Sequence, residues 1–362
     1  MEEPKTLDSL TPSQIVWRKF RKNKLAFYSL CLIAFILVLS ILGYAISPDK
    51  TPFANNQHVE LSNLKPGVSV LFVKEPQRIN VEKVGIITNM LYGTEPSFKE
   101  IPIDTFYYTA DSLHVIKYGS RESGSAIVFK LRRDVEISTK TFLLGTDKFG
   151  RDMLSRMIIG ARISLAVGFI AVLISLLIGV TLGALAGYYR GRVDAVIMWF
   201  VNVTWSVPTL LMVIAITLVL GKGFWQMFTA IGLTMWVDVA RIVRGQVLSI
   251  REKEYIDACR ILGFSDFRII TKHILPNTLG AVIIVSAANF ASAILIEAGL
   301  SFLGIGVQPP IPSWGNMIKD HYGYIVVNKA YLAFIPGIAI MLLMMAFTFV
   351  GNGLKDAFDE KM

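Results

Sequence analysis

The residues that could carry out covalent or metal chemistry are few in this sequence. It has four histidines and two cysteines among 362 residues. His58 and His114 lack the spacing of zinc ligands, and no His-Glu-x-x-His motif is present. The sequence also lacks the Gly-x-x-x-x-Gly-Lys-Ser/Thr phosphate loop, since Gly221-Lys222-Gly223 is an isolated turn motif. We therefore predict no catalytic residues, no metal site and no cofactor bound by this chain.

The most informative polar segment runs from Glu254 to Asn277 and reads EYIDACRILGFSDFRIITKHILPN. Good helix formers from Glu254 to Leu262 predict a short helix, and Gly263 can end it in the left-handed conformation. Ser265 or Asp266 can then cap a second helix. The segment is therefore expected to form two short helices that are hinged at Gly263.

The second of these helices has an amphipathic pattern. Phe267, Ile270 and Ile274 fall at i, i+3 and i+7, whereas Arg268, Lys272 and His273 are polar. Pro276 disfavours helical geometry at the preceding residue, so we expect a bend at this point.

Composition indicates an integral membrane protein. Hydrophobic residues make up 53% of the chain, charged residues 17%, and the mean hydropathy is +0.54. Because a helix needs roughly 20 apolar residues to cross a bilayer, six runs qualify as spans. They are Leu25–Ile46, Ile163–Tyr188, Ala195–Leu220, Trp225–Val243, Leu279–Phe302 and Leu332–Val350. Asp238, Arg241 and Arg244 interrupt the fourth run, and we place them at the cytoplasmic interface because a charge at the bilayer centre costs about 2.5–3.5 kcal/mol.

The orientation follows from lysine and arginine in the short flanking segments. These residues are concentrated before the first span, between the second and third, and between the fourth and fifth. Since positive flanks stay in the cytoplasm, six spans place both termini there. The net charge of +9 then reflects topology and contact with lipid, and nucleic-acid binding is not expected. The first run is longer than a signal-peptide core, so we interpret 25–47 as a transmembrane helix after a cytoplasmic segment, 1–24.

Residues 48–142 differ in composition from the rest of the chain. Charges of both signs and strand-length β-branched or aromatic runs, separated by Gly, Pro and Asn, predict a small, mostly β extracytoplasmic inserted domain. We interpret it as a docking or stability module in preference to a catalytic one.

Three blocks, in one order, carry a resemblance to a known family. The segment 254–277 resembles the EAA coupling loop of ABC-importer permeases, although Cys259 replaces the second alanine of the family's alanine pair. LLGTDKFGRDMLSRMIIGARISL at 143–165 and EAGLSFLGIGVQPPIPSWGNMI at 297–318 resemble the dipeptide/oligopeptide (Dpp/Opp) permeases, specifically their C-type subunit. The resemblance covers the N-terminal anchor and nearly everything after residue 143. The resemblance does not extend to the inserted domain, because members of this permease family are expected to carry a shorter segment there.

The resemblance implies an all-α polytopic type I ABC importer permease with six transmembrane helices, to which the inserted domain is added. The permease domain would span 143–353, with a cytoplasmic coupling loop at 244–277 and a cytoplasmic tail at 354–362. The implied partners are a B-type permease subunit as heterodimer, one or two ABC ATPase subunits that carry ATP and Mg, an extracytoplasmic substrate-binding protein and membrane lipid. The implied location is the bacterial cytoplasmic (inner) membrane. The residues implied to couple to the ATPase are Glu254, Tyr255, Ala258, Cys259, Gly263, His273, Leu275, Pro276 and Asn277.

The implied cargo is a di- or oligopeptide, with nickel or another small solute as the alternative. A secondary transporter is the rival from another class. It would need inverted repeats and acidic residues deep in the bilayer, and the predicted spans are nearly free of acids.

Polar and small residues within the spans leave several interpretations open. Pro208 should kink the third span, either as a gate or as a static bend. Asn289 either lines the translocation path or makes a hydrogen bond between helices. Glu297 lies near the outer end of its span, where an ion pair or a structural role is favoured over contact with substrate. Glycines at 179, 183 and 187 allow close helix packing, within this chain or against a second permease.

Overall fold

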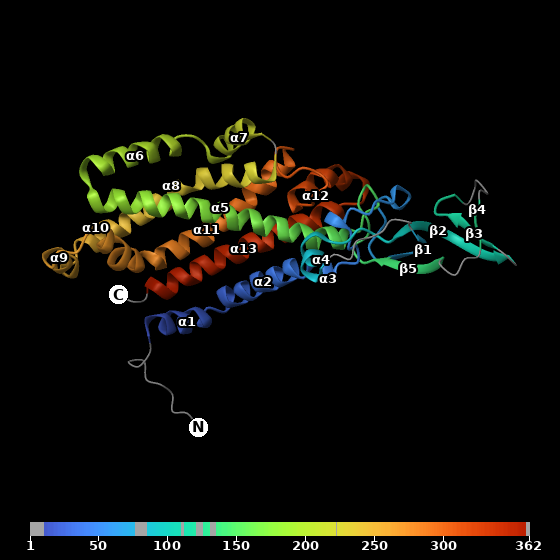
Figure 1. Ribbon diagram of the computed structural model, residues 1–362, viewed down its shortest axis with the longest axis horizontal. Coiled ribbons are helices and arrows are strands. Elements are labelled where there is room, and N and C mark those ends of the chain that lie inside the picture. The colour runs from blue at the N-terminus through green and yellow to red at the C-terminus, as the bar shows by residue number, and fades with distance from the viewer. Residues whose placement is uncertain are drawn as a thin grey trace, which may run out of the picture. The chain divides into compact units, whose positions relative to one another are not determined.

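The structure, a computed structural model, describes residues 11–76, 85–109, 112–120, 126–130, 135–221 and 223–359 (Figure 1). Its internal contacts divide the chain into two compact units. The helical unit comprises Met1–Ile36, Ser164–Gln308 and Ile338–Met362, and the sheet unit comprises Leu37–Ile163 and Pro309–Gly337. Residues 309–337 thus pack with the N-terminal part of the chain, although the predicted domains assign them to the permease core.

Long apolar helices account for most of the helical unit, and α2, α5 and α13 extend beyond it into the sheet unit. The helices of this part are α1 (Pro12–Lys22), α2 (Lys24–Ile41), α5 (Met153–Tyr189), α6 (Gly191–Trp205), α7 (Thr209–Leu220), α8 (Phe224–Arg251), α9 (Glu254–Ile261), α10 (Asp266–Arg268), α11 (Leu275–Phe302) and α13 (Tyr331–Asp359). A π-helical turn, Ile269–Ile274, joins α10 to α11.

Four single helices in the described part of the chain are long and apolar enough to cross a membrane. They are α2, α5, α13 and the continuous run Asp266–Phe302. The pair α6 and α7 passes the same test together, but its two arms are bent by 92°. The predicted third span is therefore broken where Pro208 precedes α7, because proline supplies no N–H to continue the helix. The fourth predicted span lies within α8, which is one helix of 28 residues with Asp238 in its middle. The number of six spans stays a prediction.

The three spaced glycines bring α5 and α8 together. A Cβ atom added to Gly179 would lie 2.5 Å from Val239, and one added to Gly183 would lie 2.5 Å from the carbonyl oxygen of Ala240. At Gly187 the nearest atom, 2.8 Å away, belongs to Val247. Because such separations exclude a methyl group, these glycines serve packing within the chain.

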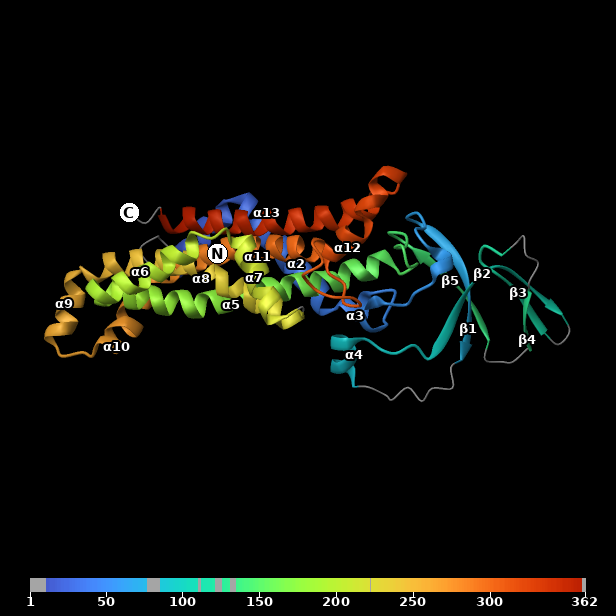
Figure 2. The same ribbon diagram turned by 90° about the horizontal axis from the view of Figure 1, so that it is seen from above.

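The sheet unit contains one five-stranded antiparallel sheet in the order β4-β3-β2-β1-β5 (Figure 2). Its strands are β1 (Val68–Pro76), β2 (Phe98–Thr109), β3 (Ser112–Lys117), β4 (Ala126–Lys130) and β5 (Glu136–Phe142). The helices of this unit are α3 (Gly43–Ile46), α4 (Ile86–Tyr92) and α12 (Trp314–His321). The prediction of β structure between residues 48 and 142 is confirmed.

Alternating side chains of β1 serve two small cores. Val70 and Phe72 pack with Leu61 and Phe142 in one cluster. Val73 packs with a second cluster that contains Ile103, Leu113 and Val115. The strand alternation therefore covers both faces of β1 with apolar contacts.

Candidate functional site

Residues 254–277 form a hairpin of helices with a defined turn. The helix α9 ends at Ile261, and Gly263 takes the left-handed conformation, with φ of +76°. The N–H of Gly263 donates to the carbonyl of Arg260 at 3.0 Å, and the N–H of Phe264 donates to the carbonyl of Cys259 at 3.1 Å. This pair of bonds is a Schellman motif, so the predicted role of Gly263 as a helix terminator is confirmed.

The second arm departs from the predicted geometry at Pro276. Leu275 keeps helical dihedral angles, and its N–H bonds to the carbonyl of Ile270, five residues earlier. The widened π turn makes room for the proline ring. The side-chain amide of Asn277 donates to the carbonyl of His273 at 2.7 Å. The proline therefore does not end the helix, which continues from Asp266 to Phe302, and the bend expected at this point stays a prediction.

The hairpin has a buried base and an exposed apolar tip. Cys259, Ile269, Ile270 and Ile274 are buried in one cluster together with residues of α5 and α8. Phe267, which the pattern places on the same face as Ile270 and Ile274, is 76% exposed, and Ile269 is buried instead. The face is shifted because the π turn changes the residues-per-turn count.

Two further apolar side chains accompany Phe267 at this tip. Ile261 is 87% exposed and Leu262 is 71% exposed, and these two residues directly precede the turn at Gly263. We call Ile261, Leu262 and Phe267 the hairpin tip.

The other residues predicted to couple lie along the two arms. The side-chain amide of Asn277 donates to the hydroxyl of Tyr255 at 3.4 Å and so links them. His273 stacks against Phe264, with ring centroids 5.8 Å apart. The remaining predicted residues divide by burial: Leu275 is half-buried, and Glu254, Ala258 and Pro276 are exposed.

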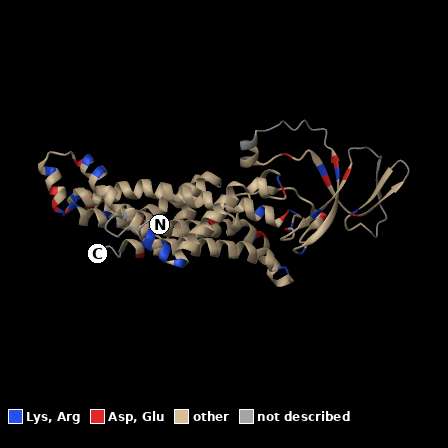
Figure 3. Cartoon of the chain, turned by 90° about the horizontal axis from the view of Figure 1, so that it is seen from below, with Lys and Arg blue, Asp and Glu red and all other residues tan. Residues whose placement is uncertain are grey.

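A hydrogen bond ties the hairpin to α5, and an ion pair joins two helices beside it. The hydroxyl of Tyr188, at the end of α5, donates to Asp266 of the hairpin at 2.6 Å. The guanidinium of Arg244 contacts both carboxylate oxygens of Asp194 at 2.5 and 2.6 Å, and this planar bidentate pair restricts rotation between α8 and α6. Figure 3 shows that Lys and Arg gather at the α9–α10 hairpin and on α1, whereas the middle of the helical unit carries few charges.

A cavity of about 250 Å³ lies at the break between α6 and α7. Its described lining is polar on several sides and comes from α6, α7, α8 and α11: Thr204, Trp205, Val207, Thr209, Met212, Thr234, Met235, Val237, Asp238, Asn289, Ser292 and Ile296. We call this space the break cavity.

Two of the residues predicted for a translocation path lie at the break cavity. Asn289 is buried, lines the cavity and donates to the carbonyl of Met235 of α8 at 3.4 Å, so it makes the hydrogen bond between helices, and its place on a translocation path stays a prediction. Pro208 stands at the N-cap of α7, between the lining residues Val207 and Thr209.

Glu297, the third predicted path residue, has a different environment. Its carboxylate is fully buried and accepts hydrogen bonds from Ser301 at 2.7 Å and from Ser164 of α5 at 3.5 Å. These contacts support a structural role between α11 and α5, and Glu297 is not among the described residues that line the break cavity.

The block at 143–165 contains a buried charge network that the sequence did not predict. Asp147 is fully buried, accepts from the backbone N–H groups of Phe149 and Arg151, and pairs with the Arg151 guanidinium at 2.6 Å. Arg156 approaches the same carboxylate at 3.6 Å. The neighbouring Lys148 forms an ion pair of 2.9 Å with Asp320 of α12. Two segments far apart in the sequence thus meet in the sheet unit, and a single sequence gives no signal of that pairing.

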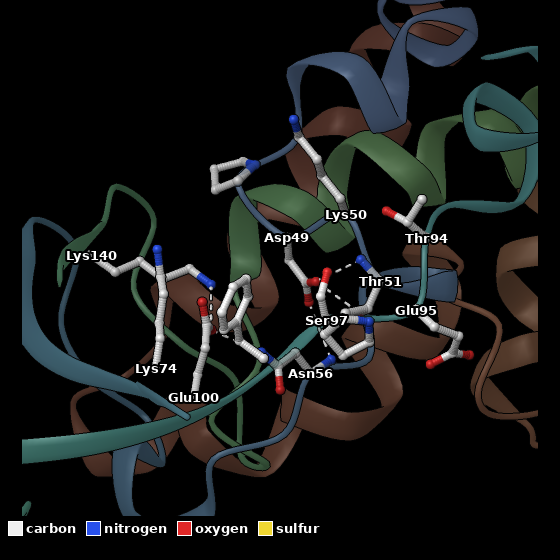
Figure 4. A pocket seen from close by; sticks show the side chains of 13 residues that line it. Asp49, Lys50, Thr51, Asn56, Lys74, Thr94, Glu95, Ser97, Glu100 and Lys140 are labelled. Carbon is white, nitrogen blue, oxygen red and sulfur yellow. Dashed lines mark hydrogen bonds and ion pairs between the residues drawn. The ribbon is translucent and has the colours of Figure 1, made fainter. Parts of the chain in front are cut away.

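A second cavity, of about 360 Å³, lies in the sheet unit between the segment after α3 and strands β1, β2 and β5 (Figure 4). Two of the carboxylates that line it have partners within the unit. Asp49 accepts from the N–H groups of Thr51 and Asn56 at 2.9 and 3.2 Å. Glu100 accepts from the side-chain amide of Asn56 at 3.0 Å and pairs with Lys140 at 3.5 Å.

Comparison with known families gives two matches. The model of the binding-protein-dependent transport system inner membrane component matches residues 179–362. The model of the N-terminal TM domain of oligopeptide transport permease C matches residues 11–66.

Individual relatives extend the match over nearly the whole chain. The dipeptide transport system permease protein DppC of Bacillus subtilis (strain 168) is 34% identical over 354 residues, which is 98% of this chain and 87% of that protein. The oligopeptide transport system permease protein OppC of the same organism is 41% identical over 62% of this chain and 73% of its own length. A solved structure of the MetNI methionine ABC transporter has 20% identity and a TM-score of 0.48 over 57% of this chain and 97% of the matched chain.

Proposed function

Because this chain belongs to the family of binding-protein-dependent transport inner membrane components, we propose that it imports di- and oligopeptides as the C-type permease subunit of an ATP-driven importer. The peptide cargo is supported by relatives whose names specify dipeptide or oligopeptide transport. ATP and Mg would be bound by separate ATPase subunits, and a B-type permease subunit would complete the pore.

The observation that carries the proposal is the construction of the hairpin at residues 254–277. Its tip presents Ile261, Leu262 and Phe267 to solvent. Its base packs against α5 and α8, and Asp266 accepts a hydrogen bond from Tyr188 of α5. An exposed apolar knob on a rigid base is suited to insertion into a cleft of a partner protein. Movement of that partner would reach the membrane helices through the buried base.

The proposed arrangement also assigns sides of the membrane. The hairpin and both termini would be cytoplasmic, in the bacterial inner membrane, where the ATPase subunits have access to them. The inserted domain would be extracytoplasmic, on the side from which a binding protein delivers peptide.

Reconstitution of the full complex into proteoliposomes tests the proposal. We expect uptake of a radiolabelled dipeptide that requires ATP inside, the binding protein outside, and both permease subunits together with the ATPase subunits. A photo-crosslinking residue at Leu262 should label an ATPase subunit. Uptake driven by an ion gradient without ATP would contradict the proposal. Crosslinking of Leu262 to the binding protein in place of an ATPase subunit would also contradict it.

A further inference from the structure

Backbone geometry at the break cavity is unusual for a membrane helix. The arms α6 and α7 together have the length and composition of one span, yet residues 206–208 leave them bent by 92° (Figure 1). Non-helical backbone at membrane depth is tolerated only where it is buried in protein or lines a water-filled cavity. The break is compatible with this rule because Val207 and Thr209 lie in the wall of a cavity.

The packing of α5 on α8 places Asp238 within the helical unit. Gly179 lies against Val239 and the carbonyl of Trp236, so it is level with Asp238. Gly179 is ten residues before Tyr189, where α5 ends, which corresponds to about 15 Å along a helix. Asp238 therefore lies well away from the end of α5, in the middle of α8, and its place at the cytoplasmic interface stays a prediction.

Arg241 and Arg244, which follow Asp238 on α8, have other partners. Arg244 pairs with Asp194. The guanidinium of Arg241 donates to the side-chain oxygen of Asn202 at 2.9 Å and lies 3.9 Å from the centre of the Trp205 ring. Its charge is close to Asp238, yet no hydrogen bond or ion pair joins the two among the residues that the structure describes.

Asp238 is also the one charged side chain in the described lining of the break cavity, and it is exposed. Around it the hydroxyls of Thr204, Thr209 and Ser292 and the amide of Asn289 provide neutral polar groups. A carboxylate that lines a cavity between long apolar helices, without an ion pair in the described part of the chain, points to a functional group that faces a pathway.

We propose that Asp238 binds the free ammonium group of a peptide as the peptide passes through the break cavity. This inference rests on the proposed function and adds a charge preference to it. The carboxylate attracts the amino end of the peptide, and the hydroxyl and amide groups accept or donate the remaining hydrogen bonds of an ammonium and its peptide group. A carboxylate end would be repelled at the same point.

Transport by the reconstituted complex tests the inference. The probes are a dipeptide with a free amino group and its N-acetylated form, and each uptake rate is divided by the amount that the isolated binding protein holds. Asp238→Asn should lower uptake of the free dipeptide by about tenfold, because one charge-assisted hydrogen bond is lost. Uptake of the acetylated form should be unchanged. Asp238→Glu should restore most of the uptake of the free dipeptide.

Matched controls separate the possible failures. Asp356→Asn makes the same change of charge on an exposed residue of α13 and should leave uptake at the wild-type rate. Wild-type rates in Asp238→Asn, or equal losses for both probes, would overturn the inference and leave the import function intact. Loss of a subunit on purification of Asp238→Asn would overturn it in favour of an ion pair with the partner permease. A wild-type complex without ATP-dependent uptake would overturn the proposed function and this inference with it.

Discussion

The indole N–H of Trp314 donates a hydrogen bond to the backbone carbonyl of Met157 at 3.0 Å, which ties α12 to the first turn of α5. The ring also lies against Gly160, where an added Cβ atom would be 3.1 Å from it. Trp314 is buried, so the contact combines a polar bond with the largest side chain available for packing.

Truncation of Trp314 should therefore destabilise the sheet unit. We expect Trp314→Ala to cost about 3–5 kcal/mol of unfolding free energy because it leaves a cavity. Trp314→Phe keeps most of the packing and should cost about 1 kcal/mol for the lost hydrogen bond. Unfolding of the purified protein in mild detergent measures both. Equal losses for the two variants would contradict the assignment of separate packing and hydrogen-bond contributions.

Stability should depend on pH through His321. This residue is buried in α12, where its Nδ1 is 2.7 Å from the carbonyl of Met317 and its Nε2 accepts from the N–H of Lys148. Burial lowers its pKa below the ordinary value of 6.5, against the opposing charges of Asp147 and Asp320. The unfolded chain then binds the proton more readily, so the stabilisation is present above pH 6.5 and decreases as pH falls below it. The slope should reach at most about 1.4 kcal/mol per pH unit.

The variant His321→Gln provides the comparison, because glutamine keeps an acceptor for Lys148 but does not titrate. Melting temperatures at pH 7.5 and 5.5 should differ less in this variant than in the wild type. His58 is a second buried histidine whose pKa burial lowers, so His58→Gln should remove a further share of the slope. A double variant with the full wild-type slope would show that other groups control the acid sensitivity.

Gly263 should be essential for coupling and dispensable for insertion. Its φ of +76° costs a side-chain-bearing residue about 1–2 kcal/mol, although no atom would meet an added Cβ within 4 Å. Gly263→Val should therefore deform the Schellman turn and lower peptide uptake by about tenfold, with ATP hydrolysis retained. Gly119 has the same open surroundings and a φ of +75°, but it lies in the sheet unit. Uptake lost equally in Gly119→Val would mean that strain at any turn, and not coupling, explains the result.

Local patterns in the sequence predicted the features that neighbouring residues determine. A glycine after a run of helix formers predicted the turn at Gly263, since a left-handed C-cap needs only the local chain. The N-cap position of Ser265 was predicted, yet its hydroxyl makes no capping bond, and Asp266 accepts from Tyr188 instead. Side-chain partners of this kind depend on which helix packs nearby, and periodicity does not specify them.

The sequence was least informative where the chain departs from regular helix. A π turn let the helix continue through Pro276, and the resulting shift buried Ile269 in place of Phe267. The hydropathy pattern placed Asp238 near the end of the fourth predicted span, because a charged residue lowers the average hydropathy and so marks the end of an apolar run. The break between α6 and α7 provides a polar cavity for that charge, and such a cavity arises only from tertiary packing.

The inserted domain should be removable if the cut follows the structure. Gly67 and Phe142 are adjacent, because the N–H of Gly67 donates to the carbonyl of Phe142 at 2.8 Å. A deletion of residues 68–141 that joins them needs little rearrangement and removes the described strands from β1 to the end of β5. We expect this variant to insert into the membrane and to purify with the ATPase subunits.

A longer deletion, of residues 48–140, should behave differently. The segment 48–66 supplies partners to buried groups of the permease: the hydroxyl of Ser155 accepts from the N–H of Asp49, and the hydroxyl of Thr146 lies between Leu61 and Leu64. Tyr331 also donates to the carbonyl of Leu64 at 2.8 Å. Each buried group left without a partner costs about 1–3 kcal/mol, so the longer deletion should fail to yield a stable complex. Equal yields of complex from the two deletions would show that residues 48–66 are as dispensable as the sheet, and loss of the ATPase from the shorter one would show that the sheet is needed for assembly.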